Sequence, residues 1–251
     1  MLNRLFSVGY LVFIGMTSVV FFCLAMVIRL LTFPFDRRRI ITNLFSALWG
    51  SIYIWCMPAW GVKIIGRDKL SLDKNCVLVS NHQSQLDILV LYRLLFPYRW
   101  VSKAEVFRLP FIGWNMRLNG DIPLKRGDKS SIADMMARCE ILLKENISIF
   151  FFPEGTRSRD GRLKPFKPGA FILAKAAKVP IQPIVLNHTR QVLPKHSLTI
   201  SGKHEMEVKV LDEIPYHRFE KMAPEDIAQM VRKIIAVHVH EMQDQTTDTL
   251  C

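Results

Sequence analysis

The sequence predicts an α/β fold, in which a mixed sheet is flanked by helices and preceded by an apolar, membrane-associated helical hairpin. Beyond Gly61, short apolar runs alternate with longer segments of helical periodicity, as in a sheet covered by helices. Before Gly61, two long runs carry no charge. We therefore predict two parts, a membrane-associated helical segment at residues 1–60 and one larger domain at residues 61–251.

The net charge of +12 predicts attraction to something anionic, such as a lipid surface, a phosphate-bearing substrate, an acidic protein or nucleic acid. The five cysteines are scattered and form no CxxC pair, which indicates reduced thiols in a cytoplasmic compartment. The sequence also has neither the Cys/His spacing of a zinc site nor a glycine-rich nucleotide motif. We therefore expect no metal and no nucleotide cofactor.

The first uncharged run covers residues 5–28, between Arg4 and Arg29. A helix of that length could cross a hydrocarbon core of ~30 Å. No small-residue cleavage site precedes Arg29, so we expect the segment to be retained. The second run, residues 40–62, follows an arginine cluster at 37–39 that favours the cytoplasmic side.

Three arrangements of these two runs remain open from sequence. They could form one or two true spans, a hairpin sunk into one leaflet with the arginine cluster against anionic headgroups, or an ordinary buried core hairpin. Membrane association is favoured, because the core helices of soluble proteins seldom stay uncharged over the ~20 residues that a span requires.

In the larger domain, residues 76–80 predict a buried strand, a helix follows from Leu86, and residues 109–113 predict a loop rich in Pro and Gly. Asp128 or Ser130 can cap a helix that ends near Asn146. The remaining predicted elements are a strand at 147–152, a helix at 171–177, a strand at 181–186, a half-exposed edge strand at 205–211 and an amphipathic helix from Pro224.

The first chemical motif, His82 with Asp87, directly follows the strand at 76–80. Five residues along one helix correspond to about 140° of rotation, so the two side chains would diverge on a continuous helix. They can meet if His82 stays in the turn and Asp87 lies one turn into the helix. Asp87 would then orient the imidazole and stabilise its protonated form, which makes His82 a general base.

The second motif is the segment 152–159, which follows the strand at 147–152. Gly155 permits close approach of the backbone, and Thr156 and Arg157 can hold a phosphate through amide, hydroxyl and guanidinium donors. Glu154 could bind a hydroxyl group or a neighbouring cation. A solvated basic turn would be the simpler interpretation of this segment alone.

Together, Asn81-His82-x-x-x-x-Asp87 and the later Phe-Pro-Glu-Gly-Thr-Arg-Ser at 152–158 resemble the glycerophospholipid acyltransferase family. The resemblance is closest to the bacterial 1-acyl-sn-glycerol-3-phosphate (lysophosphatidic acid) acyltransferases. Two further blocks, at 120–126 and 179–184, occur in the family's order, and the resemblance covers about residues 60–215.

The resemblance implies that residues 61–251 form an acyltransferase catalytic domain. His82 would deprotonate the acceptor hydroxyl with support from Asp87. Lys103 matches a lysine found near such sites and is expected to be catalytic, because Lys103 or backbone amides near the His82 turn would stabilise the oxyanion of the reaction. The block at 179–184 would shape the acyl-binding wall. The acceptor phosphate site would comprise Arg126, Glu154, Gly155, Thr156 and Arg157.

The implied reaction moves a fatty acyl group from acyl-CoA or acyl carrier protein to the sn-2 hydroxyl of lysophosphatidic acid, giving phosphatidic acid. It needs no cofactor beyond the thioester co-substrate. The expected location is the cytoplasmic face of the inner cell membrane, and nucleic acid is not an expected partner. Pro123 and Lys125 replace a bulky apolar residue and an acid of the family pattern, so a lyso-ornithine lipid or another lysophospholipid stays open as the acceptor.

Two interpretations from other classes compete with this one. A non-catalytic, membrane-tethered binder of acidic lipid or nucleic acid would explain the charge, but not the pairing of His82 with Asp87. A metal hydrolase that used His82, Asp87 and Glu154 lacks a recognisable set of ligands.

Overall fold

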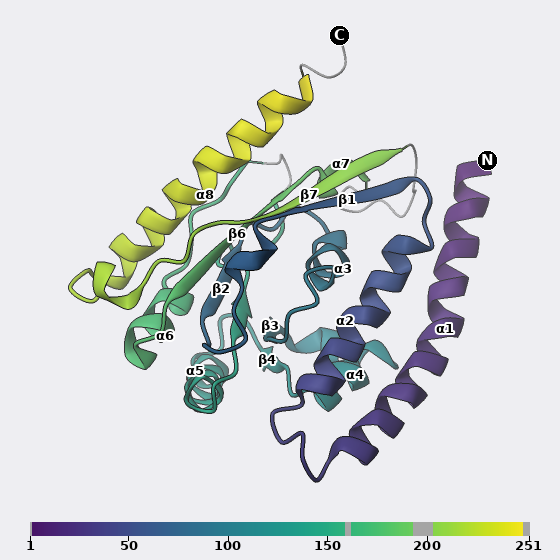
Figure 1. Cartoon of the computed structure of the whole chain (residues 1–251), viewed down its shortest axis with the longest axis horizontal. Coiled ribbons are helices and arrows are strands. Elements are labelled where there is room, and N and C mark those ends of the chain that lie inside the picture. The colour runs from purple at the N-terminus through teal and green to yellow at the C-terminus, as the bar shows by residue number, and fades with distance from the viewer. Residues whose placement is uncertain (1, 159–161, 193–202, 248–251) are drawn as a thin grey trace.

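The computed structural model describes residues 2–158, 162–192 and 203–247. Within these residues, one sheet of 7 strands runs in the order β1-β7-β6-β2-β5-β3-β4 (Figure 1). β7 pairs antiparallel with β6, and every other neighbouring pair is parallel, so the predicted mixed sheet is confirmed. The strands are β1 (Trp60–Ile65), β2 (Val77–Ser80), β3 (Arg99–Lys103), β4 (Ile122–Leu124), β5 (Ile149–Phe151), β6 (Ile181–Asn187) and β7 (His204–Val210).

Helices cover both faces of the sheet (Figure 1). The α-helices are α1 (Leu2–Thr32), α2 (Ile40–Trp55), α3 (Leu86–Tyr92), α4 (Ile112–Asn119), α5 (Lys129–Lys144), α6 (Gly169–Ala177), α7 (Thr189–Val192) and α8 (Pro224–Thr247). Short 3-10 turns are η1 (Arg67–Lys69), η2 (Ala104–Arg108) and η3 (Tyr216–Arg218). α5, α6 and α8 pack on one face, and α2, α3 and α4 pack on the other.

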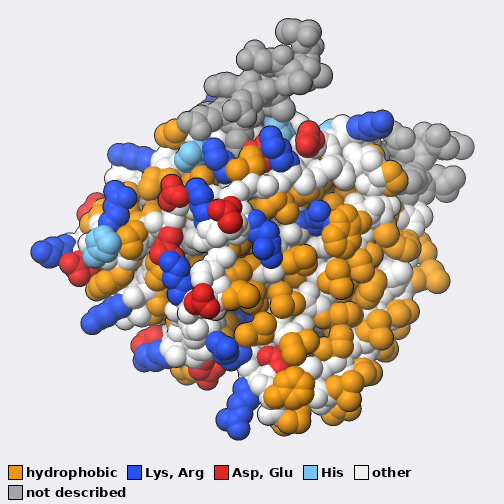
Figure 2. Space-filling view, viewed as in Figure 1, with side chains coloured by type: hydrophobic (Ala, Val, Ile, Leu, Met, Phe, Trp, Pro, Cys, Tyr) orange, Lys and Arg blue, Asp and Glu red, His pale blue; other side chains and the backbone are white. Residues whose placement is uncertain are grey.

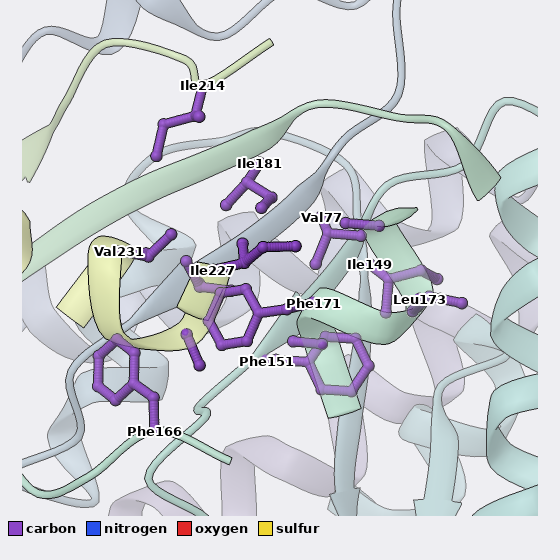
Figure 3. Close-up of a cluster of buried hydrophobic side chains, with 14 of the residues drawn as sticks. Val77, Ile149, Phe151, Phe166, Phe171, Leu173, Ile181, Ile214, Ile227 and Val231 are labelled. Atoms are coloured by element: carbon purple, nitrogen blue, oxygen red, sulfur yellow. The ribbon is translucent and has the colours of Figure 1, made fainter. Parts of the chain in front are cut away.

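Each face of the sheet has its own apolar core. Alternate side chains of one strand point to opposite faces, so Val77 and Val79 enter one core while Leu78 enters the other. Figure 3 shows the first core, in which Phe171 from α6 and Ile227 from α8 lie beneath the strands. The second core joins the sheet to α2 and α3, so it links the sheet to the amino-terminal hairpin.

Most of the predicted elements are present, two predictions were wrong in part, and the strands β1, β3 and β4 were missed. The strand at 205–211 is not an edge strand, because β7 lies between β1 and β6. β1 itself was missed, since the uncharged run at 40–62 continues into it. The predicted loop at 109–113 already contains the start of α4 at Ile112.

The amino-terminal hairpin is built into the larger domain through α2. Asn43 is buried on α2 and exchanges two hydrogen bonds with the backbone of Tyr98: its amide donates to the carbonyl (2.8 Å) and its Oδ1 accepts from the N–H (3.2 Å). Ser46, one turn later, bonds with Asn115 and Asn119 of α4. A buried polar side chain left without its partner is costly, so these bonds fix how α2 lies on the domain.

A buried charge cluster fixes the turn between α1 and α2 in the same way. Arg99 is 2% exposed and donates to the carbonyl of Arg38, while Asp121 accepts from the N–H of Trp100 at 3.0 Å. Burial raises the pKa of Asp121 to about 7, against the opposing effect of Arg99. Arg39 donates to the carbonyl of Leu118 at the end of α4 (3.1 Å).

We predict that Gly120→Ala destabilises the protein more than Gly127→Ala. Both glycines have a left-handed backbone, with φ of 83° and 81°, so both substitutions carry the same backbone strain. A Cβ at Gly120 would lie 2.9 Å from Nη1 of Arg39, whereas one at Gly127 would meet nothing within 4 Å. The excess loss at position 120 should be about 1 kcal/mol in urea unfolding, because Arg39 would have to give up its bond to the Leu118 carbonyl. Equal losses would contradict the Arg39 contact.

Candidate functional site

Four parallel strands end at one edge of the sheet and bring the predicted site residues to it. β2, β5, β3 and β4 are neighbours in that order, so their carboxyl ends lie side by side. His82 follows β2, and the segment 154–157 follows β5. Lys103 ends β3, and Arg126 follows β4. This edge is where open α/β sheets place reactive groups.

The structure joins His82 to Asp87 as the turn geometry predicts. His82 lies in the turn after β2, Asp87 lies in the first helical turn of α3, and His82 Nδ1 is 2.7 Å from Asp87 Oδ2. The same oxygen accepts the backbone N–H groups of Gln83 (2.7 Å) and Ser84 (2.9 Å). The Asp87 side chain is fully buried, while that of His82 is 16% exposed. With Nδ1 facing the carboxylate, Nε2 is the nitrogen that can accept a proton from a substrate.

The imidazole of His82 lies flat on the ring of Phe152. Their centroids are 4.0 Å apart and the planes differ by 14°, and Phe152 in turn stacks on Trp100 at 5.6 Å. Both aromatic rings belong to the core shared with α2 and α3. The imidazole therefore lies on the sheet face that carries the amino-terminal hairpin.

The backbone of His82 is held by the segment that follows β5. Its N–H donates to Oε1 of Glu154 at 2.7 Å, and its carbonyl accepts the N–H of Ser158 at 2.9 Å. Oε2 of Glu154 accepts the N–H of Lys164 at 3.1 Å. The two motifs, far apart in sequence, therefore form one hydrogen-bonded unit at the sheet edge.

Sequence reasoning assigned no role to Asn81 or Phe152. The amide of Asn81 donates to the carbonyl of Leu186, and its Oδ1 accepts the N–H of Leu186, both at 2.8 Å. These bonds continue the pairing of β2 with β6 beyond the last strand residue. Both residues stood inside the motifs, but their partners could be found only in the folded chain.

The cationic residues lie around this unit, at different distances along the edge. Arg157 is half-buried beside the Glu154 loop, and Lys103 pairs with Glu105 at the surface (3.2 Å). Arg126 is exposed before α5. Among the described residues, no hydrogen bond connects Lys103 or Arg126 with His82. β3 lies two strands from β2, or about 10 Å at a ~4.8 Å spacing, so a substrate would have to bridge that gap.

The loop between Glu154 and Arg157 turns at Gly155, which has a φ of 70°. The end of the Lys167 side chain lies over this glycine, with Cε 3.1 Å from where a Cβ would stand. Thr156 is exposed at the tip of the loop. The loop thus presents backbone, hydroxyl and cationic groups to solvent, as an anion site would.

A family model described as Acyltransferase matches residues 61–187, which include both motifs. The chain belongs to the acyltransferase family. Its edge residues are therefore those of an acyltransferase domain, and the predicted family is confirmed.

Several relatives in this family are named 1-acyl-sn-glycerol-3-phosphate acyltransferases. The chloroplastic protein BAT2 of Brassica napus is 41% identical over 82% of this chain and 60% of its own length. The protein of Saccharomyces cerevisiae is 34% identical over 75% of this chain and 59% of its own length. The chain thus spans about 60% of the length of the curated relatives it matches.

A solved structure shares the fold over almost the whole chain. The crystal structure of the 1-acyl-sn-glycerophosphate acyltransferase PlsC from Thermotoga maritima superposes with a TM-score of 0.77. The match covers 96% of this chain and 98% of that one, at 20% identity. It confirms the α/β architecture together with the amino-terminal helices.

We predict that Glu154 makes the protein less stable as the pH rises from about 4 to about 7. Burial raises the pKa of Glu154 to about 7, while its bonds to the N–H groups of His82 and Lys164 oppose the shift. Because the folded-state pKa exceeds the unfolded value of ~4.3, this stabilisation is complete below ~4.3 and is lost as pH rises through 7.

Urea unfolding at each pH, compared with Glu154→Gln, measures this contribution. The variant should show a smaller fall in the free energy of unfolding, since it lacks the titrating carboxyl. Asp121 titrates near 7 in both proteins and cancels in the comparison. If the free energy of unfolding changed with pH by the same amount in both proteins, the raised pKa of Glu154 would be contradicted.

Proposed function

We propose that the protein transfers a fatty acyl group from a thioester, acyl-CoA or acyl carrier protein, to the sn-2 hydroxyl of 1-acylglycerol-3-phosphate, giving phosphatidic acid. The observation that carries this proposal is the 2.7 Å contact between His82 and the buried Asp87 in an acyltransferase domain. The names of the relatives support the acceptor.

His82 acts as the general base of the proposed reaction. As the acceptor hydroxyl oxygen attacks the thioester carbonyl carbon, Nε2 of His82 takes the hydroxyl proton. Asp87 stabilises the resulting imidazolium through Nδ1–H, with its charge already solvated by the N–H groups of Gln83 and Ser84. When the tetrahedral intermediate collapses, the carbon–sulfur bond breaks and the thiolate leaves with the proton from His82. No covalent acyl-enzyme is needed.

The acceptor's phosphate binds to the cationic groups along the same edge. Arg157 and Thr156 lie in the loop that is bonded to the His82 turn, so a phosphate there is close to the base. Lys103 and Arg126 extend the positive charge along the edge toward β4. Such contacts between guanidinium or ammonium groups and phosphate are the strong, charge-assisted kind.

The membrane surface of the protein is centred on α1. The helix at Ser7–Thr32 contains an 18-residue window with a mean hydropathy of 2.7, of which only 11% is buried, so this helix is long and apolar enough to cross a membrane. Figure 2 shows apolar side chains gathered on the side where Figure 1 places α1 and α2. Phe33 and Phe35 in the following turn are 65% and 71% exposed. Trp114 of α4 adds to the same surface through its contact with Phe22.

The packing of α1 favours a hairpin that enters one leaflet over a true span. α1 packs along α2, from Tyr10 on the backbone of Tyr53 to Phe21 on Trp49. α2 is fixed to the sheet by its buried Asn43 and Ser46, so an upright α1 would draw the domain into the bilayer. In one leaflet, the exposed Arg37 and Arg38 would face anionic headgroups on the cytoplasmic side.

The reaction is tested by presenting the detergent-solubilised protein with a labelled acyl donor and a panel of lyso-lipids, and identifying products by mass spectrometry. Phosphatidic acid from lysophosphatidic acid is the expected main product. Preferred acylation of a lyso-ornithine lipid or another lysophospholipid would contradict lysophosphatidic acid as the acceptor and identify the other lipid in its place. Running the panel with acyl-CoA and with acyl carrier protein identifies the donor.

We predict that His82→Ala reduces turnover by at least the ~10²–10⁴-fold expected for loss of a general base. His188→Ala is the matched control, since Asn187-His188 repeats the start of the motif but has Leu193 in place of the acid. The control should retain activity, and both variants should still fold, as a cooperative unfolding transition would show. Appreciable turnover by His82→Ala would contradict the assigned base.

We predict that Met16→Lys with Val20→Lys releases the protein from vesicles. These side chains are 69% and 59% exposed on the outer side of α1, so the change leaves the α2 contact intact while placing charge in the lipid-facing surface. Ile132→Lys with Ile141→Lys on α5 is the control of equal charge. Sedimentation of the α1 variant with vesicles as efficiently as the control would rule out this membrane surface.

A further inference from the structure

We propose that the segment from Phe152 to Glu154 positions the base His82 and does not bind the acceptor. This inference rests on the proposed function for the identity of the base, and it reassigns Glu154, which the sequence placed in the phosphate site. It assigns Phe152 a role for which the sequence offered no reason.

The carboxylate of Glu154 is already occupied by the protein. Oε1 accepts the N–H of His82 at 2.7 Å and Oε2 accepts the N–H of Lys164 at 3.1 Å. The residue is 4% exposed. A buried carboxylate with a backbone donor on each oxygen is typical of a structural clamp, because each donor would be left unsatisfied without it.

The clamp is fixed from behind by α8. Arg232 donates through Nε to the carbonyl of Lys164 (3.0 Å) and through Nη2 to the carbonyl of Leu163 (2.7 Å). Lys164 therefore presents its N–H to Glu154 from a held backbone. The position of the His82 amide is thus connected through Glu154 to a helix on the opposite face of the sheet.

Glu154 holds the backbone of His82, and Phe152 holds its imidazole ring. Asp87 contacts the edge of the imidazole at Nδ1, and Phe152 covers one face at 4.0 Å and 14°. Trp100 supports Phe152 from behind. A ring held at one edge and one face cannot rotate freely about its bond to Cβ, so Nε2 stays directed at one point in the site.

The test separates turnover from acceptor binding in the full-length protein. Glu154→Gln can accept at one oxygen but turns its amide toward the other N–H donor, so one clamp bond is lost. We expect kcat to fall about 10- to 100-fold with the Michaelis constant for lysophosphatidic acid within about twofold of wild type. Arg157→Ala, at the proposed phosphate contact, should instead raise that constant about tenfold or more.

A pair of substitutions at Phe152 tests the ring contact separately. Phe152→Leu keeps an apolar side chain but removes the flat face, and should lower kcat about tenfold with little change in the acceptor's Michaelis constant. Phe152→Tyr keeps the face and should recover most of that loss. If Phe152 acted only through general packing, Phe152→Leu and Phe152→Tyr would lower kcat by similar factors.

Hydrogen exchange at the His82 amide gives a measurement that does not need activity. The amide should be protected in the wild type and exchange faster in Glu154→Gln, but not in Arg157→Ala. If the wild type acylates no lyso-lipid, the proposed function fails while this measurement still decides the clamp.

Either of two results would overturn the positioning role. The first is a Glu154→Gln variant that keeps the wild-type kcat but has a raised Michaelis constant for lysophosphatidic acid. The second is a Glu154→Gln variant in which the His82 backbone amide exchanges as slowly as in the wild type. If Glu154→Gln does not fold, the variants Phe152→Leu and Phe152→Tyr test the proposal instead. A Phe152→Leu variant with the kcat of the wild type would refute it.

Discussion

The carboxylate of Asp87 is the group on which the site depends. A fully buried anion is costly unless hydrogen bonds replace its water, and here one oxygen receives two backbone N–H groups as well as His82 Nδ1. Those N–H groups belong to the turn that separates β2 from α3. The charge that orients the imidazole is therefore also the reason why the turn has its shape.

The two faces of the sheet have different roles. The face covered by α5, α6 and α8 is an apolar core of the usual kind. The other face holds the rings of Phe152 and Trp100, the imidazole that stacks on them, and the helix α2. A side chain on this face points toward the hairpin that carries the apolar surface. In the proposed reaction, a base on this face would approach a lipid acceptor from the side of the membrane.

The motifs and the order of most elements could be predicted from the sequence because they depend on local patterns. The turn at His82 followed from the angle between positions on a helix, and the cap at Asp128 followed from its side chain. β1, β3 and β4 escaped prediction, since three to six residues carry little periodicity and pairing partners are distant in sequence. The contact between Glu154 and the His82 amide could not be predicted, because it joins residues 72 positions apart.

The amino-terminal segment is partly built into the larger domain. As a sequence, residues 1–60 read as an appendage, because charge is absent from two runs. In the fold, α2 contributes Asn43 and Ser46 to buried hydrogen bonds, and Arg99 from β3 holds the turn before it. Breaking those bonds would leave polar groups unsatisfied inside the domain. Among the described helices, only α1 is long and apolar enough to cross a membrane, and in the proposed arrangement its attachment to α2 would give the site edge of the sheet a fixed orientation relative to the lipid surface.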